Sequence, residues 1–146
     1  MTDLDLQTVI QRFAGADCSW LSTVQPDSRP HSAPVWHVWK GSRVYVVTKP
    51  TAVKVNNIHH WSGVVLTHPD PHKVIIIEGQ AEIVQGKTNL LQPLFKAKYD
   101  WDIAIDEEYS TIIEITPQKI LAWGEEGAGF RKHWTGEEVI MIVKIS

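Results

Sequence analysis

Two stretches of the chain have apolar residues at intervals of three and four positions, which is the spacing of an amphipathic helix. In the first fifteen residues these positions are Leu6, Val9, Ile10 and Phe13. Thr2 or Asp3 is expected to cap this helix and Gly15 to end it. Residues 87–99 have the same spacing at Leu90, Leu91, Leu94 and Phe95. A third, shorter helix is predicted for residues 51–60, with Thr51 as its N-cap.

Most of the remaining chain consists of apolar or alternating segments that predict β-strands, separated by turns rich in Gly, Pro, Asp and Ser. The predicted strands are residues 18–24, 31–39, 43–48, 63–67, 73–84, 109–115 and 118–123. The segments 31–39 and 43–48 are expected to form a hairpin, and Gly79 to mark a bend or bulge. Thr116-Pro117 is expected to separate the last two strands.

The end of the chain has a different character. Residues 124–138 contain four glycines and six charged residues, which favours a loop or an arm. Residues 139–145 are expected to form a last strand or a short helix. Six or seven strands in hairpin succession, with three helices, predict an antiparallel sheet, and closing it into a barrel is the economical way to remove its edges. With 146 residues, 43% of them hydrophobic, the chain is expected to fold as one domain, residues 1–146.

Charge and composition narrow the classes of function. The formal net charge is −3 and no block of Lys or Arg occurs, which argues against nucleic-acid binding. No apolar run approaches the roughly 20 residues that span a bilayer, so no membrane partner is expected. The acidic start does not resemble a secretory signal, which indicates a cytoplasmic protein. Cys18 is the single cysteine, so no internal disulfide forms.

The usual catalytic and metal motifs are not found. His59-His60 and the pair His68 and His72 lack the spacing of a helical zinc site, so no metal site is predicted. Cys18 has no recognisable activating base. The acidic run in residues 100–108 is expected to be a solvated loop. No nucleophile elbow, P-loop or dinucleotide fingerprint occurs, and the catalytic residues are unknown.

One segment has the composition of a phosphate site. Thr48, Lys49, Thr51 and Lys54 surround the predicted start of the second helix. Free backbone N–H groups and the helix dipole favour an anion there, and a lysine completes its neutralisation. The alternative is that Thr51 is only a helix cap and Lys54 only a solvated lysine.

The order of several short segments adds a resemblance. The segments are Arg29-Pro30-His31, Pro34-Val35-Trp36, Val44-Tyr45-Val46-Val47-Thr48, Lys54 with Asn57-Ile58, and Ile77-Glu78-Gly79-Gln80-Ala81. In this order the chain, from Leu21 to about Trp134, resembles the pyridoxamine 5′-phosphate oxidase-like, FMN-binding split β-barrel family. The resemblance implies a mainly β fold, a six-stranded antiparallel split β-barrel with Greek-key topology and flanking α-helices. It also implies a homodimer with a flavin in each cleft between the subunits.

The resemblance also implies a cofactor site. Its residues are His31, Pro34, Val35, Trp36, Thr48, Lys49, Thr51, Lys54 and Trp123. Lys54 stands at the position of the family's phosphate-binding lysine, and Thr48 and Lys49 match the strand end beside the phosphate and ribityl chain. Residues 34–36 match the strand whose backbone runs beside the isoalloxazine ring. Trp123 matches the tryptophan that reaches the flavin of the other subunit.

Some positions depart from the oxidases. His31 replaces an arginine, Val53-Lys54 replaces an Arg-Lys pair, and Val74 stands where the oxidases place a flavin-contacting glutamine. A glycine-rich arm, Gly127-Ala128-Gly129-Phe130-Arg131, replaces the segment that holds the vitamin substrate's phosphate. The resemblance therefore implies an FMN-binding oxidoreductase that transfers electrons or hydride to a small organic substrate. The alternatives are a deazaflavin-dependent reductase, or a flavin-, haem- or tetrapyrrole-binding protein without turnover.

Overall fold

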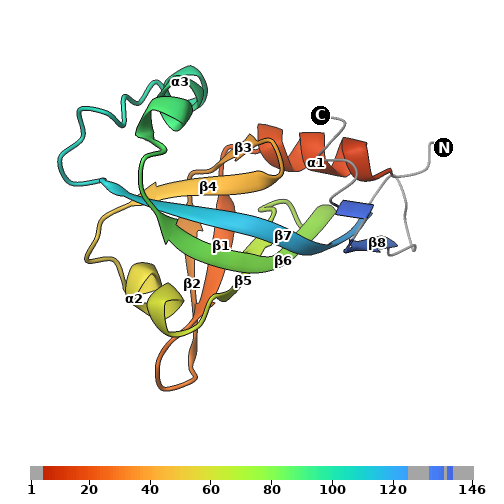
Figure 1. The fold of residues 1–146 in the computed structure, drawn as a ribbon. Coiled ribbons are helices and arrows are strands. Elements are labelled where there is room, and N and C mark those ends of the chain that lie inside the picture. The colour runs from red at the N-terminus through yellow and green to blue at the C-terminus, as the bar shows by residue number, and fades with distance from the viewer. Residues whose placement is uncertain (1–4, 125–131, 137, 140–146) are drawn as a thin grey trace.

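The computed structural model describes residues 5–124, 132–136 and 138–139, which form a curled antiparallel sheet with three helices (Figure 1). The helices are α1 (Leu6–Gly15), α2 (Val53–His60) and α3 (Thr88–Tyr99). The strands are β1 (Ser19–Val24), β2 (Pro30–Val35), β3 (Val38–Lys40), β4 (Arg43–Thr48), β5 (Gly63–Thr67), β6 (Lys73–Val84), β7 (Thr111–Gly124) and β8 (Lys132–Thr135). The predicted mainly β fold with flanking helices is confirmed.

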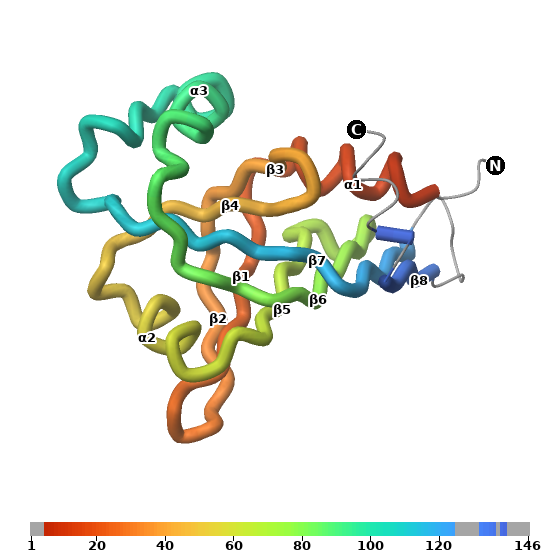
Figure 2. Tube along the Cα trace, in the orientation of Figure 1, coloured from red at the N-terminus to blue at the C-terminus, as the bar shows by residue number. Residues whose placement is uncertain are grey.

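The described part of the sheet has more strands than the predicted six. Its hydrogen-bonded order is β2-β1-β5-β6-β7-β4-β3, and β8 adds to β7. The path therefore has seven strands, with β8 off it. It curls, so that β1 and β2 cross behind β4, β6 and β7 (Figure 2). This half-barrel arrangement is consistent with a split barrel, but the six strands that the resemblance implies are too few, whereas the six or seven expected from the sequence pattern include the seven of the path.

The predicted strand 31–39 is interrupted at Trp36 and His37. β2 pairs with β1 along its whole length, whereas β3 pairs with β4. The two-residue link lets the chain pass from one end of the sheet path to the other. The side chain of His37 is fully buried, and Ser19 and the backbone of Phe13 hold it. The predicted hairpin with β4 therefore involves residues 38–40 alone.

The predicted break at Thr116-Pro117 is wrong, because β7 continues through the proline. β6 and β7 pair over twelve positions, with a register shift between Glu78 and Gly79, and Gly79 faces Pro117. A bulge at this point accommodates a residue without an N–H. A Cβ atom on Gly79 would lie 2.6 Å from the carbonyl oxygen of Thr116, so the close approach of the strands requires glycine. The expected bend at Gly79 is confirmed.

The main core lies between α1 and the concave side of the sheet. The four apolar positions predicted for the first helix are all buried in it: Leu6, Val9, Ile10 and Phe13. The cap is Asp5, whose carboxylate accepts from the N–H of Thr8 at 2.7 Å, so the predicted cap at Thr2 or Asp3 is wrong. Val139 also belongs to this core, although the rest of the predicted last element lies outside the described residues.

A second core lies on the other side of β4 and β7, under α3. Its buried residues are Val38, Tyr45, Val47, Leu91, Phe95, Ile103 and Ile112. The helix begins at Thr88, within one residue of the prediction, and ends where Asp100 adopts a left-handed conformation (φ 52°). β8 lies within the predicted glycine-rich arm, so the expectation of a loop or an arm is wrong for residues 132–135, and residues 125–131 lie outside the described part.

Candidate functional site

A cavity of about 580 Å³ lies at the end of the sheet, between α2 and α3. Figure 1 shows these two helices on either side of the ends of β4 and β7, with the loop 100–110 beyond them. The cavity is lined by Pro34, Val35, Trp36, Val46, Val47, Thr48, Lys54, Tyr99, Asp100, Trp101, Asp106 and Tyr109. Its volume is in the range of small-molecule and cofactor sites. Five of the nine predicted site residues line it.

Lys54 is the cation of the α2 side of this cavity. It lies in the first turn of α2, is partly buried, and makes no hydrogen bond or ion pair within the described chain. Burial lowers the pKa of the Lys54 ammonium group. A partly buried, unpaired cation is costly unless a ligand supplies a negative charge. Beside it, Thr48 ends β4 and is buried.

The α3 side of the cavity is an aromatic wall, formed by Trp36, Tyr99 and Trp101. The rings of Trp36 and Tyr99 are parallel within 2°, with centroids 4.4 Å apart, and Trp101 meets Trp36 edge-on at 5.8 Å. Trp101 also packs edge-on against Phe95 and Tyr109. Trp36 remains 50% exposed. Because Tyr99 covers one face of the indole, the wall presents a large flat aromatic surface.

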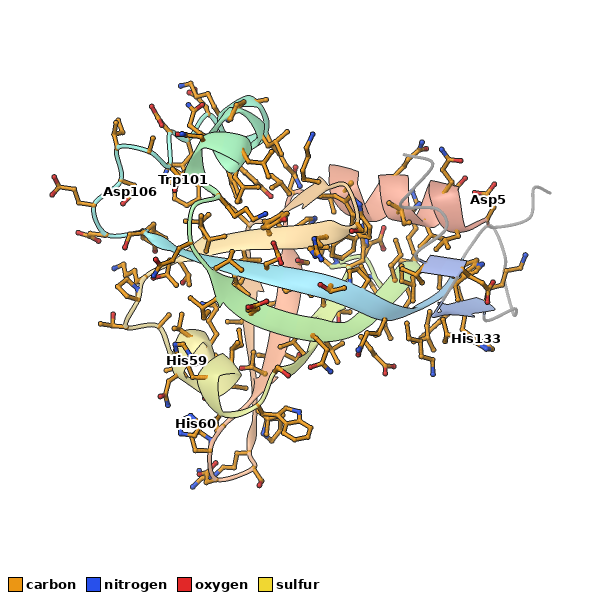
Figure 3. The ribbon with its side chains drawn as sticks, in the orientation of Figure 1. Asp5, His59, His60, Trp101, Asp106 and His133 are labelled. Carbon is orange, nitrogen blue, oxygen red and sulfur yellow. The ribbon has the colours of Figure 1, made fainter. Side chains whose placement is uncertain are left out.

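The loop after α3 is fixed by its own aspartates. The Asp106 carboxylate accepts from Trp101 Nε1 at 3.0 Å, from the N–H of Glu108 at 3.0 Å and from that of Tyr109 at 2.9 Å. These hydrogen bonds, led by that from Tyr109, lower the pKa of Asp106. Figure 3 shows Trp101 and Asp106 together on this loop, away from His59 and His60 of α2. The predicted solvated loop is confirmed for its exposed acidic residues, among them Asp100 and Glu108, whereas Trp101 and Asp106 are partly buried in the cavity lining.

The aromatic wall is also connected to α1. The Tyr99 hydroxyl lies 2.8 Å from the carbonyl oxygen of Asp17 and accepts from the N–H of His37 at 3.1 Å. Lys98 donates to the carbonyl oxygens of Ala14 at 2.9 Å and His37 at 2.8 Å. Burial lowers the pKa of Lys98 to about 8. These bonds hold the end of α3 against the link between β2 and β3, and so hold Tyr99 behind Trp36.

Four predicted site residues do not line the cavity: His31, Lys49, Thr51 and Trp123. Lys49 lies at its rim, with its ammonium group 5.4 Å from the centroid of the lining Tyr109 ring and 3.3 Å from the Glu108 carboxylate. Thr51 is exposed and precedes the true N-cap, Ala52, so its predicted capping role is wrong. Trp123 lies near the far end of β7.

His31 lies on β2 opposite Thr23, whose hydroxyl accepts from Asn57 Nδ2 of α2 at 2.9 Å. Nδ1 of His31 and Oδ1 of Asn57 are buried and have no hydrogen-bond partner in the described residues. Buried polar atoms without partners are uncommon in folded proteins. These two atoms therefore add unused hydrogen-bonding capacity next to α2, the helix that carries Lys54.

The sequence analysis did not identify the α3 side of the site. Tyr99, Asp100, Trp101, Asp106 and Tyr109 were assigned to a helix end, a solvated loop and a strand start. A signal was present, because three aromatic residues bracket the acidic run. Among the described residues no group of His, Cys, Asp and Glu could hold a metal ion. In the same part of the chain, no helix has the length and apolar character needed to cross a membrane.

A curled antiparallel sheet with a cavity at the end of its central strands is consistent with a split-barrel protein. The family model for pyridoxamine 5′-phosphate oxidase matches residues 6–124. The chain therefore belongs to the pyridoxamine 5′-phosphate oxidase family, as the resemblance predicted. A comparison with curated proteins found no match.

Solved structures show the same fold at low sequence identity. General stress protein 26 from Bacillus anthracis str. Sterne has a TM-score of 0.69 and 23% identity, over 91% of this chain and 100% of that one. A structure named F420 reductase has a TM-score of 0.64 and 21% identity, over 75% and 94%. A heme binding protein from Mycobacterium smegmatis has a TM-score of 0.73 and 17% identity, over 97% of this chain and 62% of that one.

Proposed function

We propose that the chain is an FMN-binding oxidoreductase whose cofactor occupies the cavity between α2 and α3. The observation that carries this proposal is Lys54, a partly buried cation without a partner in the described chain, in the lining of a cavity of about 580 Å³. A phosphate is the anion that such a lysine binds well, through a charge-assisted hydrogen bond. Family membership supports the same cofactor class.

The remaining lining suits the rest of a flavin. Pro34, Val35 and Trp36 border the cavity, and Thr48 lines it with Lys54. These groups offer an apolar wall and a hydroxyl to a flat ring with a polar chain. A bound flavin supplies electron or hydride transfer to a small organic substrate, and the protein supplies binding, orientation and exclusion of water. No side chain of this site is assigned a catalytic role.

The decisive experiment is a titration of the protein with FMN, followed by quenching of tryptophan fluorescence. Lys54→Met is expected to weaken FMN binding about tenfold to a hundredfold, because a hydrogen bond to a charged group contributes about 1.5–3 kcal/mol. Lys119→Met is the matched control, because Lys119 lies on β7 outside the cavity lining. Equal affinity in the two variants, or no quenching in the unchanged protein, would exclude this FMN site.

We also propose a homodimer with the cofactor at the subunit interface. Thr111, at the start of β7, pairs with the cavity residue Thr48. Trp123 lies twelve residues further along the same strand, roughly 40 Å away at strand rise. Its predicted contact with a flavin therefore requires a second copy of the chain. Sedimentation should give twice the 16.5 kDa of one chain, and a monomer at all concentrations would contradict the proposal.

A deazaflavin cofactor is the alternative within the same cavity, and the likeness to an F420 reductase structure supports it. Both cofactors need the phosphate lysine, so the two are separated by titrating the protein with each. Binding of the deazaflavin alone, still sensitive to Lys54→Met, would select the alternative. For haem the cavity offers fewer axial ligands, because its described lining contains no His, Cys or Met and has Tyr99 and Tyr109 as the residues of a haem-ligating type. A Soret band in the purified protein would contradict that argument.

A further inference from the structure

The two sides of the cavity differ in chemistry. The α2 side carries Lys54 and Thr48, which the proposed function assigns to the cofactor's phosphate end. The α3 side carries the aromatic wall of Trp36, Tyr99 and Trp101, to which no role has been given so far. The proposed function, following the family resemblance, uses the backbone beside Trp36 and leaves the indole for another ligand. The indole is half exposed although it lines a cavity.

The wall is rigid, which suits the binding of a flat molecule by stacking. Trp36 lies parallel on Tyr99, and Tyr99 is held through its hydroxyl by Asp17 and His37. Trp101 is held edge-on to Trp36 through its indole N–H by Asp106. The three rings are therefore already ordered, so a ligand that binds to them pays little entropic cost for immobilising side chains. Aromatic rings prefer offset-stacked or edge-on partners.

The carboxylates at this wall are those of Asp100 and Asp106, which line the cavity beside the rings. The Asp100 carboxylate is 89% exposed and pairs with Lys96 at 2.6 Å, so Asp106 is the carboxylate without a lysine partner in the described chain. The two other nearby lysines are also engaged: Lys98 bonds to carbonyl oxygens of Ala14 and His37, and Lys49 pairs with Glu108 at the rim. An anionic group on a ligand at the wall would therefore meet the Asp106 carboxylate, with no unpaired lysine among these three to offset it. This differs from the α2 side, where the unpaired Lys54 attracts an anion.

We propose that the wall of Trp36, Tyr99 and Trp101 is the substrate subsite, and that its substrate is a planar aromatic molecule without negative charge. This proposal rests on the proposed function, because the substrate would stack beside a flavin held at Lys54. A neutral or cationic ring gains stacking on Trp36, and a cation also gains attraction to Asp106. A phosphorylated substrate is disfavoured at this wall by the same carboxylate.

The test uses three bicyclic probes of similar size: neutral quinoline, cationic N-methylquinolinium and anionic naphthalene-2-sulfonate. Their binding to the FMN-loaded protein is measured by isothermal titration calorimetry. Trp36→Leu is the test variant, and Trp61→Leu is the matched control, since Trp61 is 62% exposed in a separate groove. We expect the neutral and cationic probes to bind, and Trp36→Leu to weaken them about tenfold. Trp61→Leu is expected to leave their affinities unchanged.

The predicted preference for ligands without negative charge is tested by comparing the affinities of the anionic and neutral probes. Naphthalene-2-sulfonate is expected to bind at least tenfold more weakly than quinoline, and Asp106→Asn is expected to narrow that difference. If the sulfonate binds as tightly as quinoline, the exclusion of anions is overturned. If Trp36→Leu and Trp61→Leu have equal effects on quinoline, the stacking subsite is overturned.

The FMN titration is repeated on every variant, which separates this inference from the proposed function. Trp61→Leu is expected to leave FMN affinity unchanged, because Trp61 lies outside the cavity lining. FMN binding with no probe binding overturns the subsite and keeps the proposed function. Probe binding that depends on Trp36 in a protein that binds no FMN overturns the proposed function and keeps an aromatic-binding wall.

Discussion

The two ends of the molecule differ in how far their polar and aromatic side chains have partners within the chain. At the α1 end, the helix fills the concave side of the sheet, and the buried polar side chain of His37 has a partner at each ring nitrogen. At the other end, α2 and α3 stand apart around a cavity, where Lys54 has no partner in the described chain and Trp36 is half exposed. The first end satisfies its polar groups within the chain, whereas the second leaves Lys54 unpaired and Trp36 half exposed, as the proposed ligand site requires.

His37 contributes to both ends, beside the hydrogen bonds that Tyr99 makes to Asp17 and Lys98 makes to Ala14. The side chain of His37 belongs to the α1 core, where its ring stacks on Phe13 at 4.5 Å. Its backbone N–H donates to the Tyr99 hydroxyl, and its backbone oxygen accepts from Lys98. The closed end therefore supports the wall of the open end. This contrast predicts that changes at the closed end cost stability, and that changes at the open end cost ligand affinity.

The largest effect on the free energy of unfolding is expected from Phe13→Ala. Phe13 is fully buried between His37 and Trp39, and replacing a buried phenylalanine with alanine costs about 3–5 kcal/mol. Trp36→Ala removes a larger side chain, but one that is half exposed, so its cost is expected to be about 1 kcal/mol. Urea unfolding measures both. Equal losses in the two variants would remove the proposed distinction between the ends.

The next largest effect is a dependence of stability on pH at the closed end. Burial lowers the pKa of His37 from 6.5 to about 4, so the folded chain resists a proton that the unfolded chain accepts. Stability is therefore full above pH 6.5 and falls as the pH falls from 6.5 to 4. The shift corresponds to about 3 kcal/mol over this window.

His37→Gln tests the assignment of this pH dependence. The variant lacks the ring stacking on Phe13, so its stability is lower at every pH, and the slope between pH 6.5 and 4 is the readout. Burial also lowers the pKa of His68. His68 therefore contributes a slope of the same sign to the unchanged protein and to the variant. The difference between the two slopes therefore isolates His37. Parallel slopes would show that His37 is not the responsible group.

Local sequence patterns were sufficient for most of the fold. The spacing of Leu6, Val9, Ile10 and Phe13 predicted α1 and its buried face correctly, because a helix against a sheet must bury one stripe. Two predictions from the pattern are wrong: a strand end at Pro117 and a continuous strand through Trp36. Whether a proline ends a strand depends on the partner strand, and here Gly79 permits a bulge. The link at Trp36 and His37 arises from contacts of His37 with residues distant in sequence.

The site was predicted only on the side that local signals describe. Lys54 and Thr48 lie next to a helix start, where a phosphate site can be read from residue types alone. Trp101 and Asp106 resembled a solvated loop, because the sequence does not indicate that α3 returns their loop to the end of β4. The aromatic wall therefore required the tertiary structure.

Lys54→Met is expected to raise the stability of the free protein and to lower its affinity for FMN. The substitution removes a partly buried, unpaired cation and keeps most of the side-chain volume, so thermal unfolding in the absence of ligand is expected to show a gain of up to about 1 kcal/mol. The same variant is expected to lose FMN affinity. A loss of stability would indicate that Lys54 has a structural role, contrary to the description of the open end.

The smallest effect is expected at the rim of the open end, where Lys49 pairs with Glu108 at 3.3 Å. The two side chains are 47% and 75% exposed, so Glu108→Gln is expected to change stability by less than about 0.5 kcal/mol. The free ammonium group of Lys49 would then add to the positive potential at the cavity rim. FMN affinity is expected to rise about twofold at low salt, and the gain to vanish near 1 M salt, where the Debye length is about 3 Å. A gain that persists at high salt would show that Lys49 contacts the phosphate directly, which would extend the anion site from Lys54 to the rim.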